Sequence, residues 1–280
     1  MFKTIVVHVD GSPLQDSRLR AAACLANAHD AHLVGSAATG LSPVEYAFIE
    51  GSLGAPVPPS DFVALRESST AHLDAFAEQA RRLGVASVET RLIEDHADYG
   101  LLLQSRYADL VVLSRNPDDS GPVLPGHLRR LPEQLALRGA RPVLVVPDSY
   151  RDEAIPGIAV AAWDGSMQAL RALTAALPLL QSASAVKLVL VNPDTLSELH
   201  GEQPGADMAL YLARHGVEVE VVVEYTRTTV GHALMSLARD CGAGLLVCGA
   251  YGHSRYREWV LGGVTRELLA RAPLPLLVAH

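Results

Sequence analysis

The sequence has few aromatic residues, few cysteines and no block of positive charge. Phe, Trp and Tyr make up 5% of the 280 residues, although hydrophobic residues as a whole reach 49%. The core must therefore consist mainly of Ala, Val and Leu, which suits buried parallel strands covered by helices. Charged residues are 19% of the chain, a balance typical of a globular protein with a sizeable core.

These absences also limit the expected partners and compartment. The formal net charge is −8 and Lys and Arg form no cluster, which argues against nucleic acid as a partner. The three cysteines, Cys24, Cys241 and Cys248, lack metal-site spacing, as expected in a reducing cytosol. No apolar run approaches the ~20 residues of a membrane span. The chain opens on a strand pattern without signal-peptide anatomy. We expect a cytoplasmic protein with no membrane partner.

Motifs for catalysis are missing too. No Gly-x-Ser-x-Gly elbow is present, and the 11 histidines form no His-Glu-x-x-His pair or other local metal motif. The His-x-Gly-His signature of adenylyl transfer and the Ser-Gly-Gly-x-Asp-Ser signature of ATP pyrophosphatases are also absent. The sequence therefore gives no catalytic residue and no metal ligand, and it disfavours a dedicated enzyme.

The two halves of the sequence repeat one another. Residues 4–12 end in Asp10-Gly-Ser and residues 158–166 end in Asp164-Gly-Ser, at an offset of 154. Each half also closes on a short apolar strand pattern. We predict a boundary in the polar segment between them, which gives domains at residues 1–148 and 156–280.

Hydrophobic periodicity predicts alternating strands and helices in both halves. In the first half we expect strands at 4–9, 32–37, 85–93, 109–114 and 143–146, and helices at 14–29, 62–83, 98–107 and 127–138. In the second half we expect strands at 158–162, 186–191, 217–225, 245–249 and 276–279, and helices at 167–181, 205–215, 229–241 and 263–271.

This alternation predicts an α/β fold of two tandem doubly wound (Rossmann-like) domains, each with a five-stranded parallel sheet. Ligands of such sheets bind beyond the C-terminal strand ends. Residues 41–60 are rich in Pro, Gly and Ser, which predicts a long loop. Asp10 and Ser12 are both suitable N-caps for the first helix.

Four glycines follow the fourth strand of the second half. Gly249 and Gly252 come at its end, and Gly262 and Gly263 open the next predicted helix. Glycine permits close approach to the backbone, and a helix N-terminus attracts phosphate. The spacing favours an anion site over the alternative, in which these glycines serve only turns and a tight helix–strand contact.

This pattern resembles the Gly-x2-Gly-x9-Gly-Ser/Thr nucleotide loop of the universal stress protein family, with Gly263 in place of Ser or Thr. The repeated Asp-Gly-Ser extends the resemblance to both halves, as tandem copies. The resemblance implies a sheet order of 3-2-1-4-5 in each half and a stress-response module that binds an adenine nucleotide. It also implies that the two final strands pack together as a pseudo-dimer, and it leaves a homodimer of whole chains open.

The resemblance also implies which residues form the site. It assigns adenine to Ala162, Asp164 and Val191, and ribose and the approach to phosphate to Cys248, Gly249, Gly252 and His253. Phosphate is implied at Gly262, Gly263, Val264 and Thr265, with Mg²⁺ carried by ATP through its phosphates. From the residues alone, Asp164 is also a suitable N-cap, Val191 a core residue, Cys248 a small buried residue and His253 a solvated loop residue.

The first half departs from the glycine pattern. Ser114 and Pro117 stand opposite Gly249 and Gly252 in the alignment of the fourth strands. Arg130 and Pro132 stand opposite Gly263 and Thr265. We predict that this half keeps the fold without binding ATP in the family manner. Arg115, Arg129 and Arg130 indicate a site for another anion, a solvated face or ion pairs with local carboxylates.

Two function classes remain from this reading. The first is a tandem stress-response module that binds ATP in its second half, with at most slow and incidental hydrolysis. The second is an interaction scaffold of the same fold that has lost the nucleotide. Gly263 favours the scaffold slightly, whereas the retained glycines and Thr265 favour binding.

Overall fold

A computed structural model describes residues 1–53, 59–115, 130–195, 203–252 and 263–280. The first half contains β1 (Thr4–Val9), α1 (Gln15–His29), β2 (His32–Ala38), α2 (Pro43–Leu53), α3 (Pro59–Arg82), β3 (Val88–Ile93), α4 (Ala97–Ser105), β4 (Leu110–Ser114), α6 (Leu131–Arg138) and β5 (Val143–Val146). The second half contains β6 (Ile158–Ala162), α7 (Met167–Leu180), β7 (Ala185–Val191), a 3₁₀ turn (Pro193–Thr195), α8 (Ala206–Arg214), β8 (Val219–Glu224), α9 (Val230–Asp240), β9 (Ala243–Gly249), α11 (Val264–Arg271) and β10 (Leu276–Ala279).

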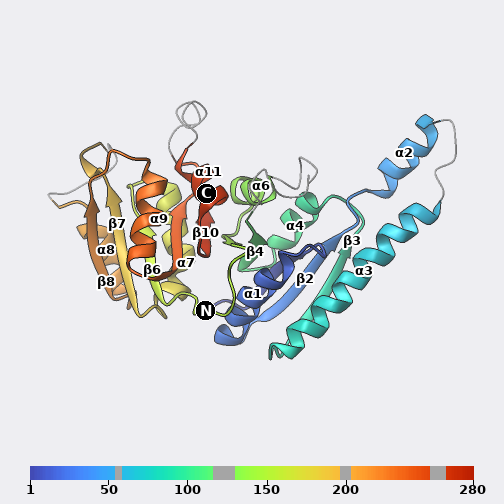
Figure 1. Cartoon of the computed structure of the whole chain (residues 1–280), viewed down its shortest axis with the longest axis horizontal. Helices are drawn as coiled ribbons and strands as arrows, with labels where there is room; N and C mark the ends of the chain where they lie inside the picture. Colours follow the sequence, from blue (N-terminus) through green and yellow to red (C-terminus); the bar gives the residue numbers. More distant parts are fainter. Residues whose placement is uncertain (54–58, 116–129, 196–202, 253–262) are drawn as a thin grey trace.

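All ten strands form one sheet, in the order β3-β2-β1-β4-β5-β10-β9-β6-β7-β8 (Figure 1). Each half therefore has the predicted order 3-2-1-4-5, and its five strands run parallel. The two halves meet where β5 and β10 pair antiparallel, with Leu144 opposite Leu277. Because β5 and β10 cover each other's edges, the halves pack as the expected pseudo-dimer within one chain.

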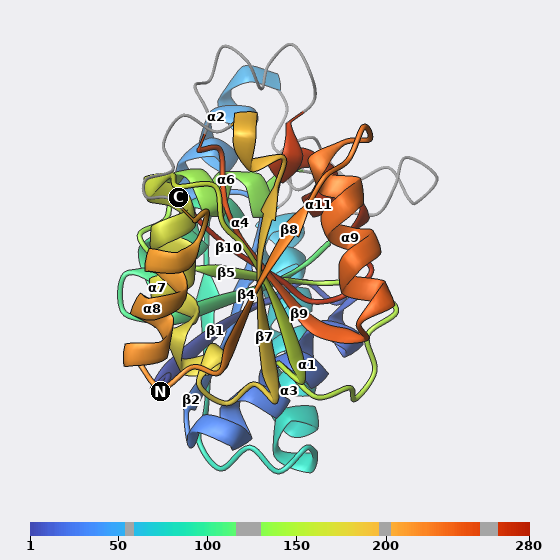
Figure 2. The ribbon, with the colours of Figure 1, turned by 90° about the vertical axis from the view of Figure 1, so that its left-hand side faces the viewer.

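Helices cover both faces of the sheet, because successive strand residues point to opposite sides. Ile5 and Val7 belong to a core under α1, α3, α7 and α8, whereas Val6 belongs to a core under α4, α6, α9 and α11. Figure 2 shows the second half from its end, with α7 and α8 on one side of the twisted strands and α9 and α11 on the other. The near-continuous apolar strands fit this double coverage.

The predicted loop at 41–60 is wrong, because the structure places α2 and the start of α3 there. The signal is a capping box. The Ser42 backbone N–H donates to Glu45 Oε2 at 2.9 Å, and the Glu45 N–H donates to Ser42 Oγ at 3.2 Å. Pro43 occupies the first helical position, where its missing N–H costs no helix bond. Figure 1 shows that α2 and the start of α3 lie beyond the end of the sheet.

The expected N-cap of α1 is also wrong. The cap position is Leu14, with no side-chain hydrogen bond. Asp10 instead accepts from the Ser12 backbone N–H at 3.1 Å and from Arg18 at 2.6 Å. The helix predicted at 127–138 begins at Leu131 within the described residues. The other predicted elements are present, with ends shifted by up to three residues.

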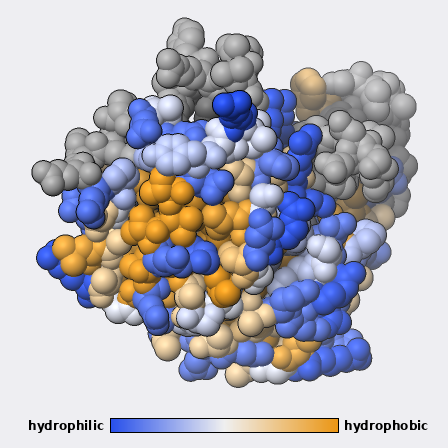
Figure 3. Space-filling view, turned by 60° about the vertical axis from the view of Figure 1, so that its left-hand side comes forward, coloured by the Kyte–Doolittle hydropathy of each residue, from blue (hydrophilic) through white to orange (hydrophobic). Residues whose placement is uncertain are grey.

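The outer strand of the second half, β8, carries half-exposed Val221 and Val223. Figure 3 shows apolar side chains at the surface on this side of the molecule. Glu220 and Glu224 flank the valines, and charges on an edge strand oppose pairing with other chains. In the part of the chain that the structure describes, no helix has the length and apolar character needed to cross a membrane.

Candidate functional site

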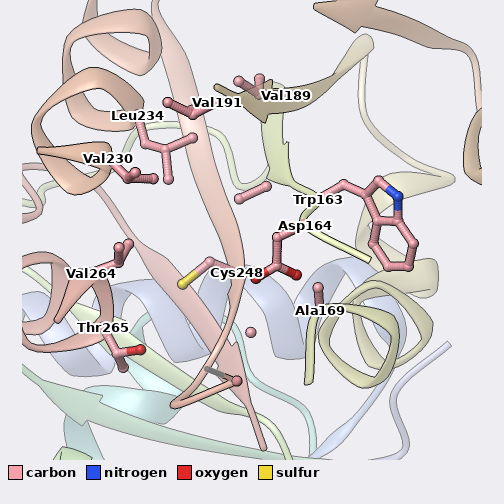
Figure 4. Close-up of a pocket in the computed structure, with 13 residues that line it drawn as sticks. Trp163, Asp164, Ala169, Val189, Val191, Val230, Leu234, Cys248, Val264 and Thr265 are labelled. Carbon is pink, nitrogen blue, oxygen red and sulfur yellow. The ribbon is translucent and has the colours of Figure 1, made fainter. Parts of the chain in front are cut away.

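Eight of the eleven predicted site residues line one cavity at the C-terminal edge of the second half's sheet (Figure 4). Its empty space is about 650 Å³, open solvent included. The predicted residues that line it are Ala162, Asp164, Val191, Cys248, Gly249, Gly252, Val264 and Thr265. Gly263 lies beside it, at the N-cap of α11. His253 and Gly262 fall outside the described residues.

The topology of the sheet explains this convergence. β6 pairs with β7 on one side and with β9 on the other, so the strand order reverses at β6. The carboxyl ends of these three parallel strands meet at one edge, where open α/β sheets bind ligands. α9 and α11 start at the same edge. Thr229 Oγ1, at the N-cap of α9, donates to Glu267 Oε1 in the first turn of α11 at 2.8 Å. This bond holds the two helix starts together.

One wall of the cavity is apolar. Val189 and Val191 of β7 and Leu234 of α9 are between 1% and 6% exposed. Figure 4 places Val191, Leu234 and Val230 close together, with Val264, Thr265 and Cys248 on the side toward α11. A flat apolar wall suits a heteroaromatic ring, because burying apolar surface is favourable without directional bonds.

Asp164 lies at the end of β6, in the middle of the cavity (Figure 4). Its Oδ1 accepts from the Ser166 backbone N–H at 3.0 Å and from Ser166 Oγ at 2.6 Å. Ser166 Oγ in turn accepts from the Ala169 N–H at 3.2 Å. The N-cap of α7 is therefore Ser166, and the alternative in which Asp164 is itself the cap is wrong. Asp164 orients the cap and also faces the cavity.

Two of the four glycines are required by packing against α7. A Cβ atom at Gly249 would lie 2.5 Å from the backbone nitrogen of Ala169. A Cβ atom at Gly252 would lie 2.9 Å from Ser166 Oγ. Close contact between the end of β9 and the start of α7 therefore explains both residues without a ligand. The same contact brings the backbone of Gly249 and Gly252 to the cavity surface.

Thr265 connects α11 to the chain that leaves β9. It is 2% exposed, and its Oγ1 accepts from the Tyr251 backbone N–H at 3.0 Å. Tyr251 has a left-handed backbone, with φ of 58°. Gly263 precedes the helix with no side-chain cap. The first N–H groups of a helix have no partner within it and carry the positive end of its dipole, so α11 gives this side of the cavity an attraction for anions.

Sequence reasoning missed five residues that line the cavity: Trp163, Ala169, Val189, Val230 and Leu234. Two of them had a usable signal. Val189 lies two residues before Val191 and therefore on the same face of β7. Leu234 follows Val230 by four residues, which places both on one face of α9.

In the first half, Arg18 of α1 joins the ends of two strands. Arg18 is 1% exposed. Its Nη2 donates to Asp10 Oδ1 at 2.6 Å, at the end of β1, and its Nη1 donates to Ser114 Oγ at 2.9 Å, at the end of β4. The guanidinium therefore spans the two strand ends between which the second half keeps its cavity. Arg115, one of the candidate anion ligands, pairs with Asp148 at 3.2 Å. Arg130 is exposed at the N-cap of α6, and Arg129 lies outside the described residues.

Residues 158–280 match the model of the universal stress protein family. A universal stress protein of Synechocystis sp. is 28% identical over 180 residues, which is 60% of this chain and 57% of that protein. This chain therefore aligns with little more than half the length of that curated relative.

Solved structures share the fold over the whole chain. A universal stress protein from Archaeoglobus fulgidus has a TM-score of 0.70 at 15% identity, over 99% of this chain and 95% of that one. A protein of unknown function from Pseudomonas aeruginosa PAO1 has a TM-score of 0.57 at 15% identity, over 99% and 92%. Identities this low establish the fold alone.

A universal stress protein in complex with cAMP overlaps 53% of this chain and 98% of its own, at 22% identity and a TM-score of 0.37. That likeness is too low to transfer its ligand to this chain. The family match in the second half, the curated relative and the shared architecture agree with one another. The second half of the chain matches the universal stress protein family, and the whole chain has the fold of solved universal stress proteins, with two copies in tandem.

Proposed function

We propose that this protein is a stress-response module that binds an adenine nucleotide, ATP, in its second half. The observation that carries the proposal is the single cavity that gathers Asp164, Val191, Gly249 and Thr265 from four separate segments. We also propose that residues 1–148 and 156–280 are the two domains, and that the first does not bind ATP.

The cavity has a part suited to each part of the ligand. The apolar wall of Val189, Val191 and Leu234 suits the adenine ring, with Asp164 at its polar edge. The start of α11, at Val264 and Thr265, suits the phosphates because it offers backbone N–H groups and a positive dipole end. His253 and Gly262 stay predicted phosphate-side residues. Mg²⁺ would accompany ATP through its phosphates.

The proposed activity is binding rather than turnover. Among the described residues that line the cavity, Asp164 is the only carboxylate, and its Oδ1 already accepts two hydrogen bonds from Ser166. Thr265 Oγ1 is held by the Tyr251 N–H. We therefore assign none of the described residues in the cavity as a general base for water. A partner molecule would recognise the nucleotide-bound form of the module.

An interaction scaffold without nucleotide is the second candidate, and one observation favours it. Packing against α7 accounts for Gly249 and Gly252 without any ligand. Gly263 also lacks the hydroxyl that the family pattern carries at this position. A scaffold would keep the same fold and would leave the apolar wall of the cavity without a specific ligand.

Tryptophan fluorescence provides a direct test. The chain has two tryptophans, Trp163 beside Asp164 and Trp259 outside the described residues. In a Trp259→Phe background we expect Mg-ATP to change Trp163 emission with a saturable dose response. Ala162→Leu, which adds bulk to the lining, should weaken binding at least ~10-fold, equivalent to about 1.4 kcal/mol.

The matched control is Ala185→Leu. Ala185 is half-buried like Ala162, but it lies at the opposite end of the neighbouring strand, where it pairs with Ile158. We expect its ATP affinity to equal that of the parent. Equal affinity in Ala162→Leu and Ala185→Leu would place binding outside this cavity. No saturable response in the parent would favour the scaffold.

A further inference from the structure

A second cavity lies at the C-terminal edge of the first half's sheet. Its empty space is about 680 Å³, open solvent included. The polar groups that line it come from the ends of β1 and β2 and from α3: His8, Asp10, Thr39, Ser68, Ser69 and His72. Arg18 lies behind Asp10 and fills the space toward β4. His8, Asp10 and Ala38 in its lining occupy the positions that Ala162, Asp164 and Val191 have in the second half's cavity, but its polar residues from α3 have no counterpart there.

His8 is buried in this lining without a hydrogen-bond partner among the described residues. Its side chain is 9% exposed, and its Nδ1 lies 3.7 Å from Asp10 Oδ2. That distance is too long for a hydrogen bond. Buried polar groups nearly always have a partner, because desolvation without one is costly. A molecule in the cavity would supply the missing partner.

His8 is uncharged at neutral pH. Its pKa is lowered to about 4, because burial, and to a smaller extent Arg18, outweigh the opposing effect of Asp10. A neutral imidazole has one N–H donor and one acceptor nitrogen. Its Nδ1 faces the Asp10 carboxylate, which favours the proton on Nδ1. That tautomer leaves Nε2 as a hydrogen-bond acceptor.

The neighbouring hydroxyls also present acceptors. Thr39 Oγ1 donates its hydrogen to the Leu41 carbonyl at 2.7 Å, and Ser69 Oγ donates to the Ala38 carbonyl at 3.2 Å. Each oxygen keeps lone pairs for a further donor. The charge of Asp10 is balanced by Arg18, at 2.6 Å. The lining is therefore rich in acceptors and close to neutral.

This chemistry selects among ligand classes. A phosphate or carboxylate would bring further acceptors and negative charge beside Asp10. A cation would be repelled by Arg18, which already neutralises that carboxylate. A ligand with several O–H donors and no charge satisfies His8, Thr39 and Ser69 together. We propose that this cavity is a separate binding site for a small uncharged polyol or sugar, with His8 as its central acceptor.

Saturation-transfer NMR with the full chain tests the proposal. The neutral probes are myo-inositol, ribitol and D-ribose, and the charged comparison probes are inorganic phosphate and putrescine. We expect transfer to at least one neutral probe, no transfer to the charged ones, and the same signal when Mg-ATP is added. His8→Leu should reduce the neutral signal at least ~10-fold in apparent affinity, about 1.4 kcal/mol.

The control is His29→Leu. His29 is also 7% exposed, but it packs on Phe2, whose ring centroid is 5.0 Å away, at the C-terminal end of α1. Its affinity for the neutral probe should equal that of the wild type. If His8→Leu does not fold, the imidazole signals of His8 in the wild-type protein serve instead, and the neutral probe should shift them. Binding of phosphate or putrescine, an unchanged His8→Leu affinity, or His8 signals that no probe shifts would overturn the proposal; the last result would mean an ordered water only.

Discussion

The two halves share a fold and differ at the point where strand order reverses. Both have the order 3-2-1-4-5 and an Asp at the end of the first strand. At the offset of 154, Arg18 in the first half corresponds to Ala172 in the second. Arg18 reaches Asp10 and Ser114, whereas fully buried Ala172 packs in the core beneath the sheet. One large side chain thus links two strand ends in the first half, and the second half has no such link from this position.

This difference shows which parts of the fold are constrained. Apolar strands and the helices that cover them stabilise the fold of both halves. The fold does not determine which residues occupy the C-terminal ends of the strands. At the strand ends of the first half, a guanidinium joins a carboxylate and a hydroxyl. The other half has an apolar wall, Asp164 and the start of α11, an arrangement that suits an external ligand.

The largest expected effect is a loss of stability when Arg18 of the first half is replaced. Arg18→Met should lower the free energy of unfolding by roughly 3 kcal/mol, because it removes a buried charge partner and leaves Asp10 and Ser114 without theirs. Urea unfolding followed by circular dichroism measures it. Adding Asp10→Asn to Arg18→Met should recover part of the loss. A single variant as stable as the wild type would show that Arg18 is not a structural element of this half.

The pH dependence of stability sharpens the same comparison. The pKa of His8 falls to about 4 in the folded state, from its usual 6.5, chiefly through burial. The unfolded chain then binds more protons between these values, so stability is full above pH 6.5 and is lost as pH falls toward 4. We expect about 2 kcal/mol less stability at pH 5 than at pH 7 from this residue.

Comparing the wild type with His8→Leu isolates that contribution. The difference between the urea midpoints at pH 7 and pH 5 should be smaller in His8→Leu than in the wild type. The acidic groups elsewhere are the same in both proteins and do not change this comparison. The pKa of His29 is also lowered by burial, so His29→Leu serves as the second reference. A variant with the same pH slope as the wild type would show that His8 is not buried as a neutral group.

A pair of serines provides the next test. Ser12 and Ser166 correspond at the offset of 154. Ser166 caps α7, whereas Ser12 Oγ is buried and has no hydrogen-bond partner among the described residues. Ser166→Ala should cost about 1 kcal/mol of unfolding free energy and weaken ATP binding through Asp164. Ser12→Ala should leave stability within ~0.5 kcal/mol of the wild type. Equal effects would mean that both halves use this serine alike.

The smallest expected effect is that of a substitution in the first half on the affinity for ATP. Ser114→Ala removes the hydroxyl that accepts from Arg18 and stands opposite Gly249 in the sequence alignment. Because Ser114 lies outside the proposed nucleotide cavity, ATP affinity measured by Trp163 fluorescence should stay unchanged. A clear loss would show that the first half contributes to the nucleotide site.

Much of the fold could be predicted from the sequence, because apolar periodicity and the repeated Asp-Gly-Ser are local patterns. α2 was missed although Ser42 and Glu45 form a capping box, since the surrounding Pro, Gly and Ser dominated the interpretation. Eight predicted site residues lie together because strand ends share an edge. Arg18 had no local signal, because its partners Asp10 and Ser114 lie 8 and 96 residues away.

The central claim is one nucleotide site per chain, in the half without the guanidinium. Titration calorimetry of the nucleotide-stripped protein with Mg-ATP measures the stoichiometry directly. The account predicts one site per chain, lost or strongly weakened in Ala162→Leu. Two sites would contradict the assignment of the first half, and no binding at all would contradict the proposed function and leave the interaction scaffold as the function of this fold.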